Sequence, residues 1–286
     1  MPFDYERLMR FSIPEIRQTY SEAQLMLYAL SLNVGQDPTD ERSLRHVYEE
    51  DLVPLPAAAT VLGYPGFWMK DEGTGIDWKN VLHGEQSLEM HRPLPRAASV
   101  VGRTTIEEIF DKGAKGAFVR SKRELRLAQS GELLSTLRQT SVCRSDGGFG
   151  GQDRKSPSPS RVPDRAPDAV HEHPSLPQQA LLYRLNGDFN SLHVDPRVAR
   201  AAGFAKPILH GLCTYGIAAY ALTAALCEYE AGRLKRFDAR FTGSVYPGET
   251  LRTSLWRIGP GQASFRCSVL ERDITVLDYG FAEYVS

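Results

Sequence analysis

The sequence predicts an α+β fold in which two antiparallel sheets, each wrapped around a central helix, join into one continuous sheet. Three observations predict this fold. A single stretch rich in Gly, Pro, Ser and charge divides the chain into halves of comparable length, each half has one apolar helical segment, and several long strand-like runs follow each segment. An antiparallel sheet can bury one face on a helix, so two such units side by side would close one sheet.

The dividing stretch runs from Asp146 to Gln179 and reads DGGFGGQDRKSPSPSRVPDRAPDAVHEHPSLPQQ. Its composition is typical of a linker or surface excursion, because it offers little apolar surface to bury. The sequence therefore predicts an N-terminal unit over residues 1–150, a linker over residues 151–179 and a C-terminal unit over residues 180–286.

In the N-terminal half, a short helix is predicted over residues 56–62, opening on Pro56 and ending near Gly63. Strand-like runs separated by turns follow it. We expect strands at residues 85–91, 99–109, 117–127 and 132–143.

The C-terminal half repeats this plan with a longer helix over residues 208–227. The turns YPGE, GPGQ and RD separate the runs that follow. We expect strands at residues 238–241, 250–258, 264–271 and 274–284.

The helical segment 208–227 contains no Asp, Glu, Lys or Arg, and its length approaches that of a membrane span. However, it includes His210, Thr214 and Tyr215 and is rich in Ala and Gly. A helix that is apolar nearly all round is also typical of one enclosed by its own protein. We therefore predict a buried helix and no membrane partner.

Composition excludes several classes of function. The formal net charge is −1 and no long basic block occurs, so we expect no nucleic-acid partner. The four cysteines have no CxxC spacing and are expected to be reduced thiols. The N-terminus MPFDYERLMR lacks the apolar region of a signal peptide, so a cytoplasmic location is predicted.

The loop before the long helix, YRLNGDFNSLHVDP, contains Asp188 and His193 in a stretch broken by Asn and Gly. Asp195 and Pro196 fit the N-cap and first position of a short helix over residues 196–202. Neither Asp188 nor His193 fits a capping position so well. Asp188 is either a turn-former through its own side chain or, with His193, a reacting group.

The start of the long helix strengthens the second interpretation. Free backbone N–H groups at a helix N-terminus can stabilise an oxygen that gains negative charge. Gly211 lies in the first turn, where glycine costs helix stability. Either a ligand carbonyl or a neighbouring strand approaches closely at this position.

The string YRLNGDFNSLHVDPRVARAAGFAKPILHGLCTYG resembles the signature of the MaoC-like, type-2 (R)-specific enoyl-CoA hydratases, a family with the hot-dog fold. The strings LGYPGFWM, VLHGEQSLEMHRPLP, DKGAKGA, SDGGFGG and ERDITVLDYG extend the resemblance over nearly the whole chain. It implies a double hot-dog fold and the reversible addition of water to a trans-2-enoyl-CoA, giving an (R)-3-hydroxyacyl-CoA. It implies no metal and no redox cofactor, since a coenzyme A thioester is the substrate.

Carried over by position, the resemblance implies that Asp188 and His193 are the catalytic pair and that the Gly211 amide forms an oxyanion hole. It implies that Asn190 lines the site. This sequence departs from the family at Asn186, where Ser is common, and at Ser191, where Pro is usual. We assign His210 to the substrate-binding residues with Asn190. Arg184 and Lys206 flank the loop and either bind coenzyme A phosphates or remain solvated charges.

The N-terminal half is expected to be a catalytically silent copy. Laying Tyr28 over Tyr183 puts Asn33 opposite Asp188 and Pro38 opposite His193, and neither replacement can shuttle a proton. The interior of this half, around LVPLPAAATVLGYPGFW, is expected to accept an apolar acyl tail.

Other functions compete with the hydratase. His193, Asp195 and His210 mimic a 2-His-1-carboxylate iron site. A non-catalytic acyl-CoA-binding protein and an acyl-CoA thioesterase are further alternatives on the same fold. The sequence leaves open whether the chain is a monomer or a homodimer.

Overall fold

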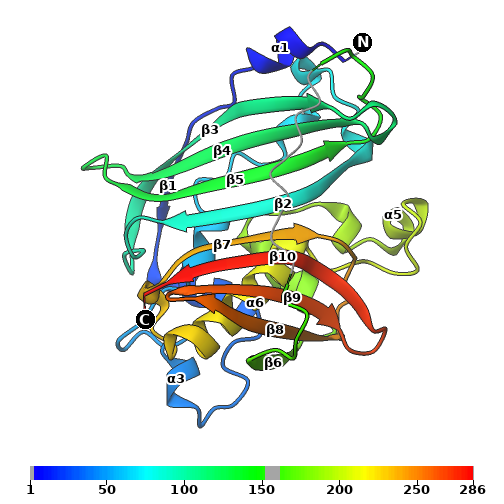
Figure 1. The fold of residues 1–286 in the computed structure, drawn as a ribbon. Helices are drawn as coiled ribbons and strands as arrows, with labels where there is room; N and C mark the ends of the chain where they lie inside the picture. Colours follow the sequence, from blue (N-terminus) through cyan, green and yellow to red (C-terminus); the bar gives the residue numbers. More distant parts are fainter. Residues whose placement is uncertain (1–2, 152–161, 286) are drawn as a thin grey trace.

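The computed structural model describes residues 3–151 and 162–285, and these form one antiparallel sheet of ten strands (Figure 1). The N-terminal half contributes β1 Ile16–Tyr20, β2 Val81–Met90, β3 Ala98–Asp111, β4 Ala117–Leu127 and β5 Leu133–Cys143. The C-terminal half contributes β6 Ala169–Pro174, β7 Leu234–Phe241, β8 Thr250–Gly259, β9 Gln262–Val269 and β10 Ile274–Tyr284.

The strand order shows that the two halves repeat one topology. The order is β1-β3-β4-β5-β2-β7-β10-β9-β8-β6, so each strand of one half has a counterpart at the mirrored place in the other. The halves join where β2 pairs antiparallel with β7, with Leu88 opposite Phe237. The predicted α+β, double hot-dog architecture with one continuous sheet is confirmed.

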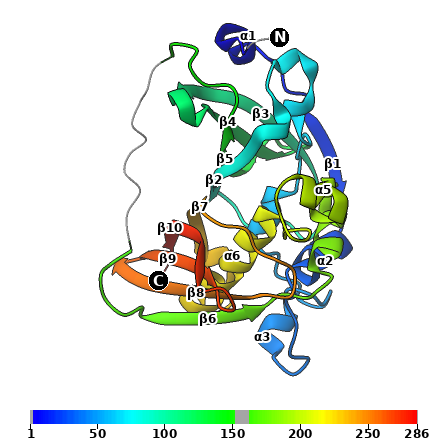
Figure 2. The same ribbon diagram turned by 90° about the vertical axis from the view of Figure 1, so that its right-hand side faces the viewer.

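The central helix of the C-terminal half is α6, Gly211–Cys227, and it is buried within the protein's own core (Figure 2). The C-terminal half of the sheet curves around it, and Tyr215 stacks on Phe237 of β7 with ring centroids 4.3 Å apart. The prediction of a buried helix is confirmed. No described helix has both the length and the apolarity needed to cross a bilayer. The counterpart of α6 in the N-terminal half, η1 (Pro56–Thr60), is a short 3-10 helix that begins at the expected proline.

The shorter helices surround this core. The α-helices are α1 Tyr5–Met9, α2 Glu22–Ser31, α3 Glu41–Leu44, α4 Gln179–Tyr183 and α5 Pro196–Ala201. The other 3-10 helices are η2 Trp68–Lys70, η3 Glu72–Thr74, η4 Trp78–Asn80, η5 Gly113–Lys115, η6 Arg184–Asn186, η7 Ser191–His193 and η8 Ala231–Arg233.

Equivalent residues of the two halves meet where α2 packs against the segment containing α4. Tyr28 and Tyr183 are both buried, with ring centroids 6.2 Å apart. Three residues further along each segment, the side-chain amide of Asn186 donates a hydrogen bond to Ser31 Oγ at 2.8 Å. In both pairs the residues stand at equivalent positions of the two halves when Tyr28 is aligned with Tyr183. The contacts therefore support that alignment.

The expected linker over residues 151–179 is wrong in part. Residues 169–174 form β6, which pairs antiparallel with β8, and residues 152–161 lie outside the described part of the chain. The sequence pattern did not predict this strand, because AVHEHP is largely polar and contains a proline. The proline is tolerated because the strand lies at the edge of the sheet. The other edge strand, β1, reads IRQTY and was not predicted either.

Candidate active site

The loop between α4 and α5 carries the candidate reacting groups and lies beside the N-terminus of α6. Gly187 has a φ of 107°, a backbone conformation that favours glycine, and this residue turns the chain from η6 toward Asp188. Asn190 then starts η7, because its side-chain oxygen accepts a hydrogen bond from the Leu192 amide at 3.2 Å. These two turns bring the side chains of Asp188 and His193 close to one another.

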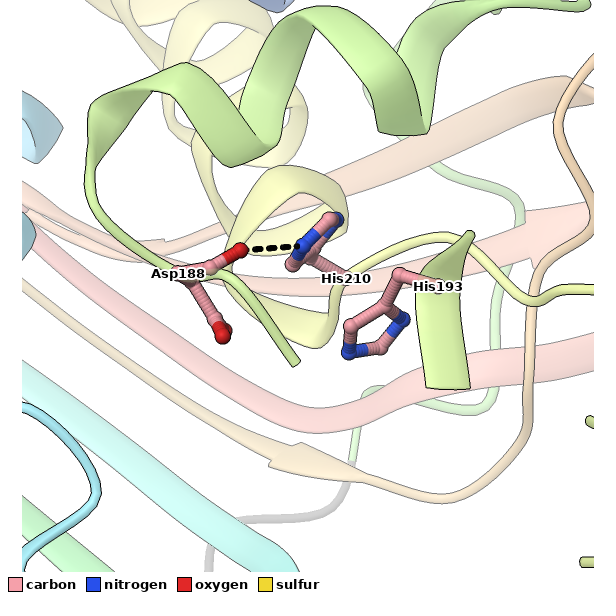
Figure 3. Close-up of side chains that lie close together, drawn as sticks. All are labelled: Asp188, His193 and His210. Atoms are coloured by element: carbon pink, nitrogen blue, oxygen red, sulfur yellow. Dashed lines mark hydrogen bonds between the residues drawn. The ribbon is translucent and has the colours of Figure 1, made fainter. Parts of the chain in front are cut away.

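Asp188, His193 and His210 form one cluster (Figure 3). One side-chain ligand atom from each of the three residues lies within 4.8 Å of the others. Figure 3 shows the Asp188 carboxylate and the His193 ring side by side, each facing the space between them. Within the described chain no hydrogen bond joins these two side chains directly. A water at about 2.8 Å from both fits such a separation.

One hydrogen bond sets the tautomer of His193. Its Nδ1 lies 2.8 Å from the backbone oxygen of Ile208, and this oxygen can only accept, so Nδ1 carries the proton. Nε2 of the neutral ring is therefore a free acceptor. Burial lowers the pKa of His193, against the opposing effects of this hydrogen bond and of the Asp188 charge. His193 is thus a neutral base at neutral pH.

Asp188 forms the turn that the sequence offered as one alternative, and its reacting role stays a prediction. Its Oδ1 accepts a hydrogen bond from the Asn190 amide at 3.2 Å, which is the turn formed by an aspartate with the backbone two residues on. Its Oδ2 has no hydrogen-bond partner among the described residues. One carboxylate oxygen therefore fixes the loop and the other is available to a ligand.

His210 contacts both members of this pair, and its predicted role in substrate binding stays a prediction. Its Nε2 donates a hydrogen bond to the backbone oxygen of Asp188 at 3.2 Å, and its ring stacks on His193 with centroids 3.8 Å apart and planes at 28°. Burial, with a smaller contribution from His193, lowers the pKa of His210 to about 3. The His210 ring is therefore neutral at neutral pH, and it holds the Asp188 backbone and packs on the His193 ring.

Two buried histidines should make stability depend on pH. Burial lowers the pKa of His173 to about 4, as it lowers that of His210 to about 3, whereas an unfolded imidazole titrates near 6.5. The stabilisation is present in full above pH ~6.5 and is lost as pH falls toward the folded values, because only the unfolded chain binds the proton. We expect each of these two histidines to lower the free energy of unfolding by roughly 2 kcal/mol between pH 7 and pH 5. Urea unfolding at pH 7, 6 and 5 tests this, and a constant free energy of unfolding would contradict it.

The N-terminus of α6 presents free donors. The amides of Cys213 and Thr214 both bond to the His210 carbonyl, whereas those of Gly211 and Leu212 have no partner among the described residues. A Cβ on Gly211 would lie 3.1 Å from the ring of Phe241 on β7. Contact with a neighbouring strand therefore explains the glycine, and its amide remains available to an incoming oxygen.

Asp195 is a helix cap, as predicted, and the iron site built on it is wrong. Its side chain accepts a hydrogen bond from the Arg197 amide at 2.8 Å and pairs with the Arg197 side chain. Asp188 takes its place beside the two histidines. Imidazole binds a metal in the plane of its ring, and two rings stacked face to face do not aim their lone pairs at one point.

The remaining predicted binding residues lie around this cluster. Arg184 lies 4.8 Å from the ring centroid of the exposed Phe189, and its Nε is shielded from solvent without a described partner. Lys206 is exposed, with its Nζ 5.2 Å from the ring centroid of Tyr246. Asn190 uses its side-chain oxygen as the cap of η7. Their roles toward a ligand stay predictions.

Two residues near the cluster come from the N-terminal half and were missed. Burial lowers the pKa of His83 to about 4, its ring lies 4.5 Å from that of Phe241, and the charge of Asp188 also acts on it. Burial raises the pKa of Tyr64 to about 12, and the Asp188 charge adds to this shift. Their sequence contexts, VLHGEQ and LGYPGFW, do not show that the His83 and Tyr64 side chains lie near Asp188, because this proximity depends on the fold.

Comparisons with known proteins agree with this architecture. A MaoC like domain matches residues 158–278, and an MFE-2 hydratase 2 N-terminal domain matches residues 18–145. The chain is 38% identical to enoyl-CoA hydratase 2, peroxisomal, of Arabidopsis thaliana, over 96% of this chain and 94% of that protein. It is 40% identical to 3-hydroxyacyl-thioester dehydratase Y of Mycobacterium tuberculosis, over 93% of each chain. The solved structure of a MaoC-like dehydratase from Phytophthora capsici has a TM-score of 0.87 at 32% identity and covers 99% of both chains.

The fold and these matches define a double hot-dog enzyme of the hydratase and dehydratase class. The chain belongs to the MaoC-like family of enoyl-CoA hydratase 2 enzymes, as its resemblance to that signature implied.

Proposed function

We propose that the protein adds water to a trans-2-enoyl-CoA, giving an (R)-3-hydroxyacyl-CoA, and catalyses the reverse dehydration. The observation that supports this most is the juxtaposition of the free Asp188 oxygen and the free His193 Nε2 beside the unpaired amides of α6. Such a set can hold one water and one carbonyl oxygen at once.

In the proposed reaction, the thioester oxygen accepts a hydrogen bond from the Gly211 amide, which stabilises the negative charge as the C2–C3 double bond opens. His193 Nε2 takes a proton from the water as the water oxygen bonds to C3. The Asp188 carboxylate accepts a hydrogen bond from the same water, takes over the proton that His193 removed, and delivers this proton to C2. Both additions occur on one face of the double bond. These steps use two side chains, one amide and water.

A hydration assay tests this proposal. Trans-2-enoyl-CoA esters of short, medium and long chain are incubated with the protein, and loss of enoyl absorbance, release of free thiol and chirality of the product are followed together. We expect loss of absorbance without thiol release and an (R) product. Release of thiol would indicate a thioesterase, and binding without turnover would indicate an acyl-CoA-binding protein. Turnover abolished by a chelator and restored by metal would favour a metal site.

The Gly211 amide can be tested separately from the glycine's small size. Proline lacks the N–H but is favoured at the first position of a helix, and His210 already has the extended backbone that precedes proline (ψ 134°). We expect Gly211→Pro to lower kcat by about 10²-fold, as the loss of one oxyanion donor does. Gly211→Ala has the same contact with Phe241 but keeps the amide, so equal losses in both variants would contradict this role.

The N-terminal half is proposed to supply no acid or base. At the place of Asp188 it has Asn33, whose side-chain amide donates a hydrogen bond to the Pro174 backbone oxygen at 2.9 Å. Arg184 and Lys206 are proposed to meet the phosphates of coenzyme A, because Arg184 has no carboxylate partner among the described residues and Lys206 is exposed.

A further inference from the structure

A small cavity lies inside the N-terminal half, between the inner face of the sheet and the chain that follows η1. Its volume is about 30 Å³, which exceeds the ~10–15 Å³ that one water needs. Most of its lining is polar, whereas the sequence predicts that the interior of this half accepts an apolar acyl tail. The lining consists of Thr60, Tyr64, Pro65, Trp68, Gln86, Thr104, Ser121, Arg123, Leu137, Gln139 and Leu212.

Arg123 is the unusual member of this lining. Alternate residues of β4 face inward, and at these positions Arg123 takes its place among Val119, Ser121 and Leu125. Its side chain is inside the protein, since the residue is only 8% exposed. By contrast Arg126, on the same strand, is 42% exposed and pairs with Glu124 at 2.8 Å.

The partners of Arg123 leave its charge uncompensated. Its Nη2 donates hydrogen bonds to the backbone oxygens of Ala59 and Thr60, at 3.2 and 2.5 Å, and its guanidinium lies 5.3 Å from the Tyr64 ring centroid. Its Nε has no hydrogen-bond partner, and no described carboxylate pairs with it. Burial lowers its pKa to about 10, so it is charged at neutral pH. A buried cation is costly unless an anion or further hydrogen bonds compensate it.

A second unsatisfied group lies in the same cavity. Thr104 Oγ1 is buried without a hydrogen-bond partner. Thr104 is on β3, directly opposite Arg123 on the adjacent strand β4. Buried polar atoms without partners are few in native proteins. Two of them in one cavity mark a place where a polar group, either a water or part of a ligand, can bind.

The cavity adjoins the candidate active site. Leu212, which lines it, directly follows Gly211 in α6. Tyr64, also in the lining, is close enough to Asp188 for the carboxylate charge to raise its pKa. An acyl chain whose thioester oxygen meets the Gly211 amide would therefore extend toward Arg123.

We propose that this cavity selects acyl chains that end in a carboxylate, which Arg123 binds through its Nε, with Thr104 contributing its hydroxyl. The proposal rests on the proposed hydration and specifies its substrate class. The substrate is thus the coenzyme A thioester of a trans-2-enedioic acid, and Arg123 determines specificity at the end remote from the chemistry.

The test compares two series of trans-2-enoyl-CoA esters with increasing chain length, one ending in methyl and one in carboxylate. At one chain length we expect kcat/KM of the wild-type protein to be about 10- to 100-fold higher for the carboxylate, the range of a hydrogen bond to a charged group. Arg123→Gln should abolish this preference and leave turnover of the methyl series within a few fold. Arg126→Gln, the matched change at the exposed arginine of the same strand, should keep it.

The other outcomes separate the two proposals. Wild-type protein that hydrates both series alike, or prefers methyl ends, overturns the carboxylate site and leaves the hydratase intact. Equal losses for both series in Arg123→Gln would show that Arg123 only anchors η1, which also overturns it. If neither series is hydrated, the proposed function itself fails. Should Arg123→Gln not fold, the wild-type preference alone decides.

Discussion

Asp188→Asn is expected to lower kcat for enoyl-CoA hydration by about 10³-fold, the typical contribution of a positioned acid or base. Asparagine keeps the side-chain oxygen that accepts the Asn190 amide, so the turn should survive while the carboxylate is lost. The measurement is kcat on a short trans-2-enoyl-CoA, with the thermal unfolding midpoint as the check on folding. Because only the reacting oxygen changes character, the midpoint should match that of the wild-type protein.

A matched control lies seven residues further on. Asp195→Asn makes the same chemical change at the cap of α5, and asparagine caps helices as well as aspartate does. This variant should hydrate at the wild-type rate. Wild-type turnover by Asp188→Asn, or a comparable loss in both variants, would remove the carboxylate from the mechanism.

The second large effect is expected at His193. Asparagine at this position can still donate a hydrogen bond to the Ile208 backbone oxygen, but it has no counterpart of Nε2. We expect His193→Asn to lower kcat by about 10³-fold. The pH profile of kcat/KM provides a second readout, since this base works only when neutral.

The sign of that pH effect follows from burial. Burial lowers the pKa of His193, so the neutral form persists below the value near 6.5 of a free imidazole. Wild-type kcat/KM should therefore fall only at pH values more acidic than ~6.5. The residual activity of His193→Asn should lack this acid limb, and an unchanged limb in the variant would assign the titration to another group.

Most of the fold follows from local sequence pattern. The strand β10 has the predicted bounds, and the turn residues RD precede it. The long helix is recognisable from twenty positions without Asp, Glu, Lys or Arg. The edge strands β1 and β6 are not recognisable, since they are short and polar and each pairs with a single described neighbour. Their existence depends on long-range pairing, which no local pattern encodes.

The candidate site divides in the same way. Asp188, His193 and Gly211 stand out through loop chemistry, helix start and family resemblance. The contact of His210 with Asp188 could not be predicted, because it depends on a hydrogen bond to the backbone of a residue 22 positions away. Arg123 was also missed, since a lone arginine in the charged run SKRELR gives no sign that its side chain faces inward.

The central claim is that Asp188 and His193 act on one shared water, and kinetics of the double variant Asp188→Asn/His193→Asn test it most directly. Groups that work as a unit give losses that do not add, so the double variant should retain about the kcat of the slower single variant. If the two losses instead multiply, each residue acts in a separate step and the shared water is wrong.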